Sequence, residues 1–162
     1  MIFITLGSQK FQFNRLLKAV DDIIFAQTGY SKAVDDIIFA QTGYSDYQPQ
    51  HYKYKHFLDK NEFECLIEQA DIVITHGGTG AIIGAVKKGK KVIAIPRLAK
   101  YGEHVDNHQV QLVNQFKELG LIYACEDMDL EKALYTVKKM TFKTYISNTE
   151  TIIWSLEEFI EN

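Results

Sequence analysis

The chain has 162 residues, of which 46% are hydrophobic and 24% are charged, and these proportions are typical of a soluble globular protein of one domain. We therefore expect a single domain over residues 1–162. The formal net charge is −3 and no dense run of lysine and arginine is present, which argues against nucleic acid or anionic lipid as a general partner.

The sequence also favours a cytoplasmic location. No apolar run approaches the roughly 20 residues of a membrane span, and the N-terminus lacks the pattern of a signal peptide. Cys65 and Cys125 are isolated and lack CxxC spacing. Buried thiols in a reducing compartment are therefore expected, rather than a disulfide or a metal site.

The first elements are a strand, a turn and a helix. Residues 2–6 form a short apolar run that predicts a strand, and Gly7 and Ser8 follow directly at its carboxyl end. This glycine turn is a candidate to face a ligand. Apolar residues at helical spacing then predict an amphipathic helix from Gln12 to about Phe25.

An exact repeat begins inside this predicted helix. Residues Lys18–Ser31 recur letter for letter as Lys32–Ser45. A repeat architecture needs at least three units, so we reject a solenoid, and either a local duplication or a repeated segment in the record explains the pattern. We expect the first copy to complete the helix and residues 37–41 of the second copy to form a strand, so that tertiary context overrides propensity in one copy.

The next stretch leads to a second helix. Residues 46–56 are polar and tyrosine-rich, which predicts a loop and a short edge strand whose tyrosines either contact a partner or cover the sheet edge. Asp59 and Glu62 have the spacing of a capping box. They predict the start of a helix with an apolar face that continues to Ala70.

The centre of the chain is a strand, a glycine turn, a helix and a strand. Residues 72–75 are a short, β-branched apolar run typical of a strand buried on both faces. Gly77, Gly78 and Gly80 follow His76, and residues 81–88 return to helical composition before a second buried strand at 92–95. In such a βαβ unit the turn lies at the carboxyl end of a parallel strand, facing a helix N-terminus, where a phosphate or diphosphate binds.

The remaining elements complete an α/β protein with a parallel sheet flanked by helices. A polar loop after Pro96 leads to a helix from about Val105 and reaches the same crevice as the glycine turn. Further predictions are a strand at 121–124 and helices at 130–139 and 147–160.

The glycine turn does not match the common nucleotide motifs. Its glycines do not fit the GxGxxG fingerprint of dinucleotide folds. Residues 84–90 satisfy GxxxxGK, but Lys91 replaces the magnesium-binding hydroxyl and the segment precedes a strand instead of following one, so an ordinary P-loop is excluded. His76 is by default a structural residue, and its place beside the glycine amides makes it a weak catalytic candidate able to donate to a phosphate oxygen.

A second polar cluster lies near the start of the helix after Pro96. It consists of Asn107, His108 and Gln109, and its simplest interpretation is helix capping by Asp106 or Asn107. The functional alternative is hydrogen bonding to a hydroxyl-rich group beside the phosphates. Neither cluster has metal-ligand spacing, and no Ser/His/Asp set is evident, so we expect no metal.

The stretch THGGTGAIIGAVKKGKKVIAIPRLAKYGEHVDNHQVQLV resembles the C-terminal, donor-binding half of GT-B glycosyltransferases of the MurG-like family 28. With MIFITLGSQKFQFNRLL and FAQTGYSDY, the chain is more closely similar to the PssE-type subunit of bacterial capsule and exopolysaccharide galactosyltransferases. A eukaryotic relative of that subunit is the soluble subunit of a two-part UDP-N-acetylglucosamine transferase.

The resemblance implies a split enzyme. This chain would supply the UDP-sugar site, and a membrane-anchored partner would supply the N-terminal half, the binding of the lipid-linked acceptor and the recruitment of the complex to the inner face of the membrane. The family analogy assigns three groups of site residues. They are Gly7 and Ser8 near the diphosphate, His76, Gly77, Gly78, Thr79 and Gly80 holding it, and Asn107, His108 and Gln109 at the donor sugar. Related enzymes often carry a ribose-binding acid where this chain has Gly84, and Glu103 is a candidate substitute.

The implied reaction is the inverting transfer of galactose from UDP-galactose to a lipid-linked glucose. Negative charge grows on the departing diphosphate, and backbone amides aimed at it would stabilise the transition state without a metal. The general base is not assigned. Two alternatives are a UDP-N-acetylglucosamine transferase subunit and a non-catalytic enhancer that stabilises or activates a membrane-anchored galactosyltransferase.

Overall fold

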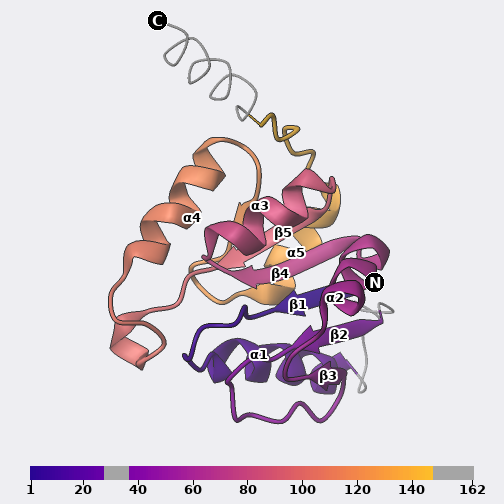
Figure 1. Ribbon diagram of the computed structural model, residues 1–162, viewed down its shortest axis with the longest axis vertical. Coiled ribbons are helices and arrows are strands. Elements are labelled where there is room, and N and C mark those ends of the chain that lie inside the picture. The colour runs from indigo at the N-terminus through magenta and orange to yellow at the C-terminus, as the bar shows by residue number, and fades with distance from the viewer. Residues whose placement is uncertain (28–36, 148–162) are drawn as a thin grey trace, which may run out of the picture.

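Strand β1 (Ile2–Thr5) lies near the middle of a six-stranded sheet with the order β3-β2-β1-β4-β5-β6, in which all paired strands are parallel (Figure 1). This computed structural model describes residues 1–27 and 37–147. The other strands are β2 (Ile38–Gln41), β3 (Lys53–Lys55), β4 (Ile72–His76), β5 (Lys91–Ile95) and β6 (Tyr123–Ala124). The helices are α1 (Asn14–Gln27), α2 (Lys60–Gln69), α3 (Thr79–Lys87), the 3-10 turn η1 (Ala99–Tyr101), α4 (His108–Glu118) and α5 (Leu130–Lys139).

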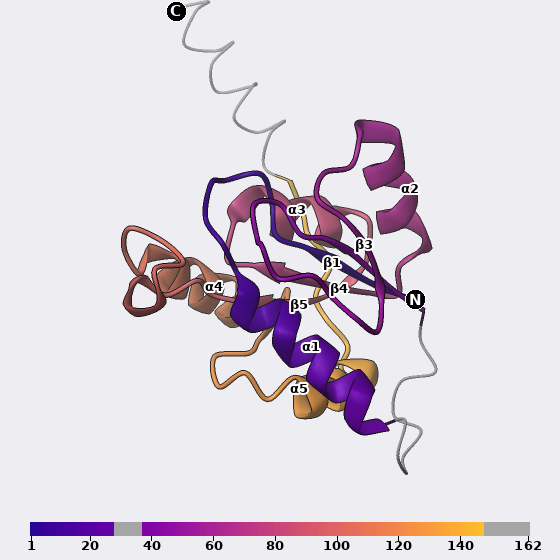
Figure 2. The ribbon, with the colours of Figure 1, turned by 90° about the horizontal axis from the view of Figure 1, so that it is seen from below.

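The helices cover both faces of the sheet, which confirms the predicted α/β class. Helices α1 and α5 pack on one face, and α2, α3 and α4 contribute to the core on the other (Figure 2). Successive strand residues point to opposite faces. In β4, for example, Ile72 and Ile74 join the core under α1 and α5, whereas Val73 joins the core under α2 and α3. Burial on both faces explains why the inner strands are continuous apolar runs.

The order of the strands creates a switch point between β1 and β4. Thr5 of β1 is paired with Thr75 of β4, so the carboxyl ends of the two strands lie side by side. The chain leaves β1 toward α1 on one face, and it leaves β4 toward α3 on the other face. The two outgoing turns therefore diverge and leave a crevice, which is where parallel sheets of this kind bind ligands.

The two identical copies adopt different structures, as the sequence predicts. Within the first copy, residues 18–27 continue α1, and Val20 is buried against the sheet. Within the second copy, Ile38–Gln41 form β2, which pairs with both β1 and β3. Residues 28–36 lie outside the described part of the chain.

Most predicted elements are confirmed. The capping box of α2 is present, because the Asp59 carboxylate accepts from the Glu62 amide at 2.9 Å and the Glu62 carboxylate accepts from the Asp59 amide at 3.3 Å. Residues 53–55 form the predicted edge strand β3. Tyr47 and Tyr52 of the preceding loop donate to the Asp21 carboxylate and the Leu17 carbonyl, which favours their role in covering the sheet edge.

Three predictions need correction. Helix α4 begins at His108 instead of Val105, because the loop before it closes on itself through the Asn107 side chain, which accepts from the Ala99 amide at 2.9 Å. Strand β6 contains only Tyr123 and Ala124. Cys65 is exposed on α2, where its sulfur accepts from the Gln69 side chain, and only Cys125 is buried as expected.

Two further features concern the described residues alone. The helix predicted over 147–160 lies outside them apart from Ser147, which is not helical. Among the helices that are described, none has the length and hydropathy needed to cross a bilayer.

Candidate functional site

The carboxyl ends of β1, β2 and β4 open into a cavity of about 500 Å³. The other walls are the turn after β1, helix α2 and the first turns of α3. This volume falls within the range of roughly 300–1,000 Å³ that is usual for small-molecule sites, and the cavity lies at the switch point of the sheet. Six of the predicted site residues line it, namely Gly7, Ser8, His76, Gly78, Thr79 and Gly80.

The N-terminal end of α3 forms one wall of the cavity. Gly78 is the N-cap, with φ −79° and ψ 125°, and no side chain of the described residues caps this end of the helix. The first amides of a helix have no carbonyl partner within it, so those of Thr79 and Gly80 are available at the cavity wall. Together with the positive end of the helix dipole, they form an anion site.

The backbone amide of Gly77 is not free to bind an anion. Its amide donates to Oε1 of Gln109 at 3.1 Å, and the same oxygen accepts from the Arg97 amide at 3.1 Å. A Cβ on Gly77 would lie 2.8 Å from the Cβ of Gln109 and 3.0 Å from Cγ2 of Val113. Glycine is therefore needed here so that α4 can approach the turn, and the predicted contact of Gly77 with a diphosphate is corrected to a structural role.

The imidazole of His76 is held between the two glycine turns. A Cβ on Gly7 would lie 2.7 Å from Cε1 of His76, and a Cβ on Gly78 would lie 2.3 Å from its Nε2. Gly7 also has φ +70°, which disfavours other residues. The absence of side chains at both positions leaves the space that the ring fills.

The surroundings of His76 keep the ring neutral. Burial, and to a smaller extent the nearby positive charge of Arg97, lower the pKa of His76 to about 4. Thr75 donates its hydroxyl proton to the Thr5 carbonyl at 2.9 Å, and its oxygen lies 3.4 Å from Nδ1 of His76. This oxygen can accept from Nδ1–H, which leaves Nε2 as an acceptor. Such an imidazole is a weak base at neutral pH. The predicted hydrogen bond from His76 to a phosphate oxygen remains a prediction, because it requires the other tautomer, with the proton on Nε2.

The loop between β5 and α4 does not bring its predicted residues into the cavity. The Glu103 carboxylate forms a two-point ion pair with Arg15, at 2.9 Å for each bond, and accepts from the Leu98 amide at 3.0 Å. Glu103 is buried in these contacts and is not among the residues that line the cavity, so it does not serve as a ribose-binding acid there.

Three other predicted residues also lie outside the cavity lining. Asn107 closes the loop onto Ala99, His108 is hydrogen-bonded to Asp106, and Gln109 is buried behind the turn. The predicted contact of Asn107, His108 and Gln109 with a donor sugar remains a prediction. The simpler interpretation, helix capping, is confirmed in part: the Asp106 carboxylate accepts from the His108 amide at 3.1 Å, whereas Asn107 is the N-cap residue but its side chain makes no capping bond.

Arg97 is a buried charged residue beside the site that the sequence analysis missed. Its side chain is buried, and its Nη2 donates to the carbonyls of Leu6 at 2.9 Å and Phe11 at 3.2 Å, on both sides of the first glycine turn. Burial lowers the pKa of Arg97 to about 10, with an opposing effect of Glu103, so the guanidinium is charged at neutral pH. It therefore fixes the turn after β1 and adds positive charge behind the cavity. Its position two residues after the predicted strand at 92–95 was the available signal.

The sequence analysis also missed some of the residues that line the cavity. Gln41 ends β2, and Phe63 lies on α2, and both line the cavity. Gly84 also lines it, and a Cβ there would have open space around it. The lining residues include no aspartate, glutamate, lysine or arginine, so the cavity itself supplies amides and neutral groups for an anion but no strong general base.

Comparisons with known proteins agree with this geometry. The profile of the glycosyltransferase family 28 C-terminal domain matches residues 1–160. In Saccharomyces cerevisiae, the protein named UDP-N-acetylglucosamine transferase subunit ALG13 is 34% identical over 58 residues, which are 36% of this chain and 27% of that protein. The match thus spans about a quarter of the length of this curated relative.

Solved structures share the fold. A glycosyltransferase of kitacinnamycin superposes with a TM-score of 0.61 at 19% identity, over 86% of this chain and 35% of that one. The solution structure of ALG13 superposes with a TM-score of 0.56 at 19% identity, over 99% of this chain and 96% of that one. At these identities the likeness establishes the fold, which is the Rossmann-like half of a GT-B glycosyltransferase.

Proposed function

The chain belongs to the family of the glycosyltransferase family 28 C-terminal domain, and on that premise we propose that it binds the UDP-sugar donor of a two-component glycosyltransferase. The observation that carries the proposal is the set of free amides at Thr79 and Gly80, which opens on a cavity at the switch point. A diphosphate there would accept these N–H groups and would face the positive end of α3.

The chemistry of the departing group supports this arrangement. Breaking the bond between the sugar and UDP adds negative charge to the diphosphate, so the amides bind the transition state more tightly than the ground state. The charge of Arg97 acts in the same direction from behind the turn. Because none of the described residues that line the cavity is a strong base, we place the base that activates the acceptor hydroxyl in the partner chain.

The donor that the relatives favour is UDP-N-acetylglucosamine. The matched ALG13 proteins are named as subunits of a UDP-N-acetylglucosamine transferase, whereas no comparison supports UDP-galactose or a role in capsule or exopolysaccharide synthesis. The word subunit in those names also supports a separate partner, which would bring the lipid-linked acceptor and hold this chain at the cytoplasmic face of a membrane.

A charge placed in the first turn of α3 tests the donor site. A Cβ at Gly80 would have open space, and an aspartate in a first helical turn is favourable for the helix, so Gly80→Asp is expected to fold normally. Its carboxylate would repel a diphosphate at a distance of a few ångströms, which should weaken UDP binding at least about tenfold in calorimetry. Gly80→Ala is the control and should retain most of the affinity.

If Gly80→Asp binds UDP as tightly as the original chain, the donor-site proposal fails and the chain acts as a non-catalytic enhancer of its partner. The sugar is tested separately, by titrating UDP-N-acetylglucosamine and UDP-galactose into the chain co-purified with its native partner and lipid fraction. Preferential turnover of UDP-galactose would overturn the choice of donor and leave the diphosphate site intact.

A further inference from the structure

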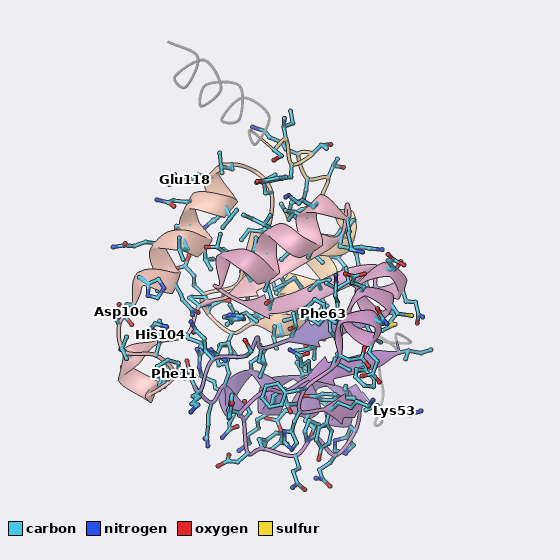
Figure 3. The ribbon with its side chains drawn as sticks, viewed as in Figure 1. Phe11, Lys53, Phe63, His104, Asp106 and Glu118 are labelled. Carbon is cyan, nitrogen blue, oxygen red and sulfur yellow. The ribbon has the colours of Figure 1, made fainter. Side chains whose placement is uncertain are left out.

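Two histidines and an aspartate meet in the loop that leads into α4. His104 and Asp106 lie side by side there, next to Phe11 (Figure 3). With His108 they form a group in which one ligand atom from each residue lies within 4.8 Å of the other two. The sequence analysis weighed His108 without His104, because only the bend of this loop brings the two rings together.

The contacts within the group are specific to one nitrogen of each ring. Nδ1 of His104 lies 3.3 Å from Oδ1 of Asp106, and Nδ1 of His108 forms a hydrogen bond with the same oxygen. The two rings pack edge to face, with 4.6 Å between their centroids. The carboxylate thus occupies the point at which both Nδ1 atoms converge.

We propose that His104, Asp106 and His108 bind one zinc ion, or another borderline divalent metal, through the two Nδ1 atoms and the carboxylate. Two imidazoles and a carboxylate form a ligand set that suits zinc, copper or nickel far better than magnesium or calcium. Tetrahedral zinc with bonds of about 2.0–2.1 Å places its ligands roughly 3.3 Å apart. The group therefore needs only small side-chain rotations, and the metal would replace the hydrogen bonds that Asp106 now forms with the two Nδ1 atoms.

The surroundings of these three side chains favour a preformed metal site. The side chain of His104 is 7% exposed and stacks on Phe11 with 4.9 Å between the ring centroids, so one ligand is already fixed. Asp106 and His108 are about half exposed, which leaves an entry path and an open position for water. The positive end of α4 opposes a cation, so the charge of Asp106 is essential to the site.

A metal here would act on the first turn of α4. His108 precedes Gln109, which holds the glycine turn through the Gly77 amide. Metal binding would therefore stiffen the loop and its link to the second glycine turn. This inference does not depend on the proposed donor site.

The test is titration of the full chain with zinc chloride, with any affinity tag removed. Since Cys65 exposes a thiol that could also bind zinc, the measurements use the Cys65→Ser background. We expect one zinc ion per chain, with affinity reduced at least about tenfold in both Asp106→Asn and His108→Ala. His56→Ala is the matched control, because His56 is exposed on another loop, and it should leave the affinity unchanged.

A spectroscopic readout separates this site from surface binding. Long-range proton–nitrogen correlation spectra should show zinc on Nδ1, with the proton retained on Nε2, for both His104 and His108. His104→Phe keeps an aromatic ring against Phe11 and should also abolish binding while the chain stays folded. Absence of binding, equal binding in all variants, or coordination through Nε2 would overturn the proposal.

Discussion

Replacing Gly78 by alanine tests the packing of the glycine turns around His76. The backbone of Gly78 has φ −79° and ψ 125°, which alanine adopts without strain, so the effect is steric alone. The new Cβ would lie 2.3 Å from Nε2 of His76 and 3.0 Å from Cδ2. Movement of the ring is restricted, because Gly7 also packs closely against it, with its Cβ position 2.7 Å from Cε1.

The expected cost follows from this overlap. Overpacking a buried site costs about 1–3 kcal/mol, and the short distance places Gly78→Ala at the upper end of that range. Gly80→Ala changes the same residue type in the same turn, but its Cβ meets open space, so it should stabilise the helix by about 0.5–1 kcal/mol. The two variants should therefore differ by about 3–4 kcal/mol, a large share of the roughly 5–15 kcal/mol that stabilises a domain.

Urea unfolding at neutral pH measures this difference through the midpoints, provided that the slopes agree. The double variant Gly78→Ala with His76→Ala supplies the decisive comparison, because removal of the imidazole removes the clash and should restore part of the loss. Equal stability of Gly78→Ala and Gly80→Ala, or no recovery in the double variant, would refute the packing described here.

Three further predictions concern other parts of the chain. Gly84→Glu should raise UDP affinity several-fold in calorimetry, because the new carboxylate would line the cavity and accept from ribose hydroxyls, whereas Gly84→Ala should not. Asp21→Asn should lower the free energy of unfolding at pH 7 by about 2–3 kcal/mol. Burial raises the pKa of Asp21, but hydrogen bonds from the Gln50 amide, the Tyr47 hydroxyl and His51 outweigh it and hold the pKa below its ordinary value. The stability that Asp21 contributes is therefore present above about pH 4 and is lost as the pH falls through the pKa of the folded state. Urea unfolding curves of the two proteins should converge at that low pH. Deleting residues 32–45 should abolish cooperative unfolding, because the single remaining copy cannot supply both the end of α1 and strand β2; a native-like circular dichroism spectrum would contradict this.

The position of the site could be predicted from the sequence because it depends on local signals. The β-branched run of β4 and the glycines after it locate a strand end and a helix start, and these two features alone create the free amides at Thr79 and Gly80. The signal for the start of α2 was equally local, because Asp59 and Glu62 form the capping box through hydrogen bonds with each other's backbone amides.

Other parts of the site depend on contacts between distant segments, and sequence patterns carry little information about them. Gln109 looked like a surface amide at a helix start, but its oxygen bonds two backbone amides from separate turns, at Gly77 and Arg97. Glu103 looked free to meet a ribose, but its partner Arg15 lies on α1. In both cases the side chain satisfies buried polar groups that only the folded chain brings near it.

The duplicated segment shows how strongly the sheet decides local structure. The residues IIFAQ form the last turns of α1 in the first copy, and in the second copy they form β2 with one residue before it. Intrinsic propensity is identical in both places, so it cannot select either structure. The second copy is a strand because a parallel neighbour is available on each side, in β1 and β3. The first copy continues a helix that Phe13 and Leu16 already anchor to the core. Each copy therefore takes its structure from its neighbours in the fold.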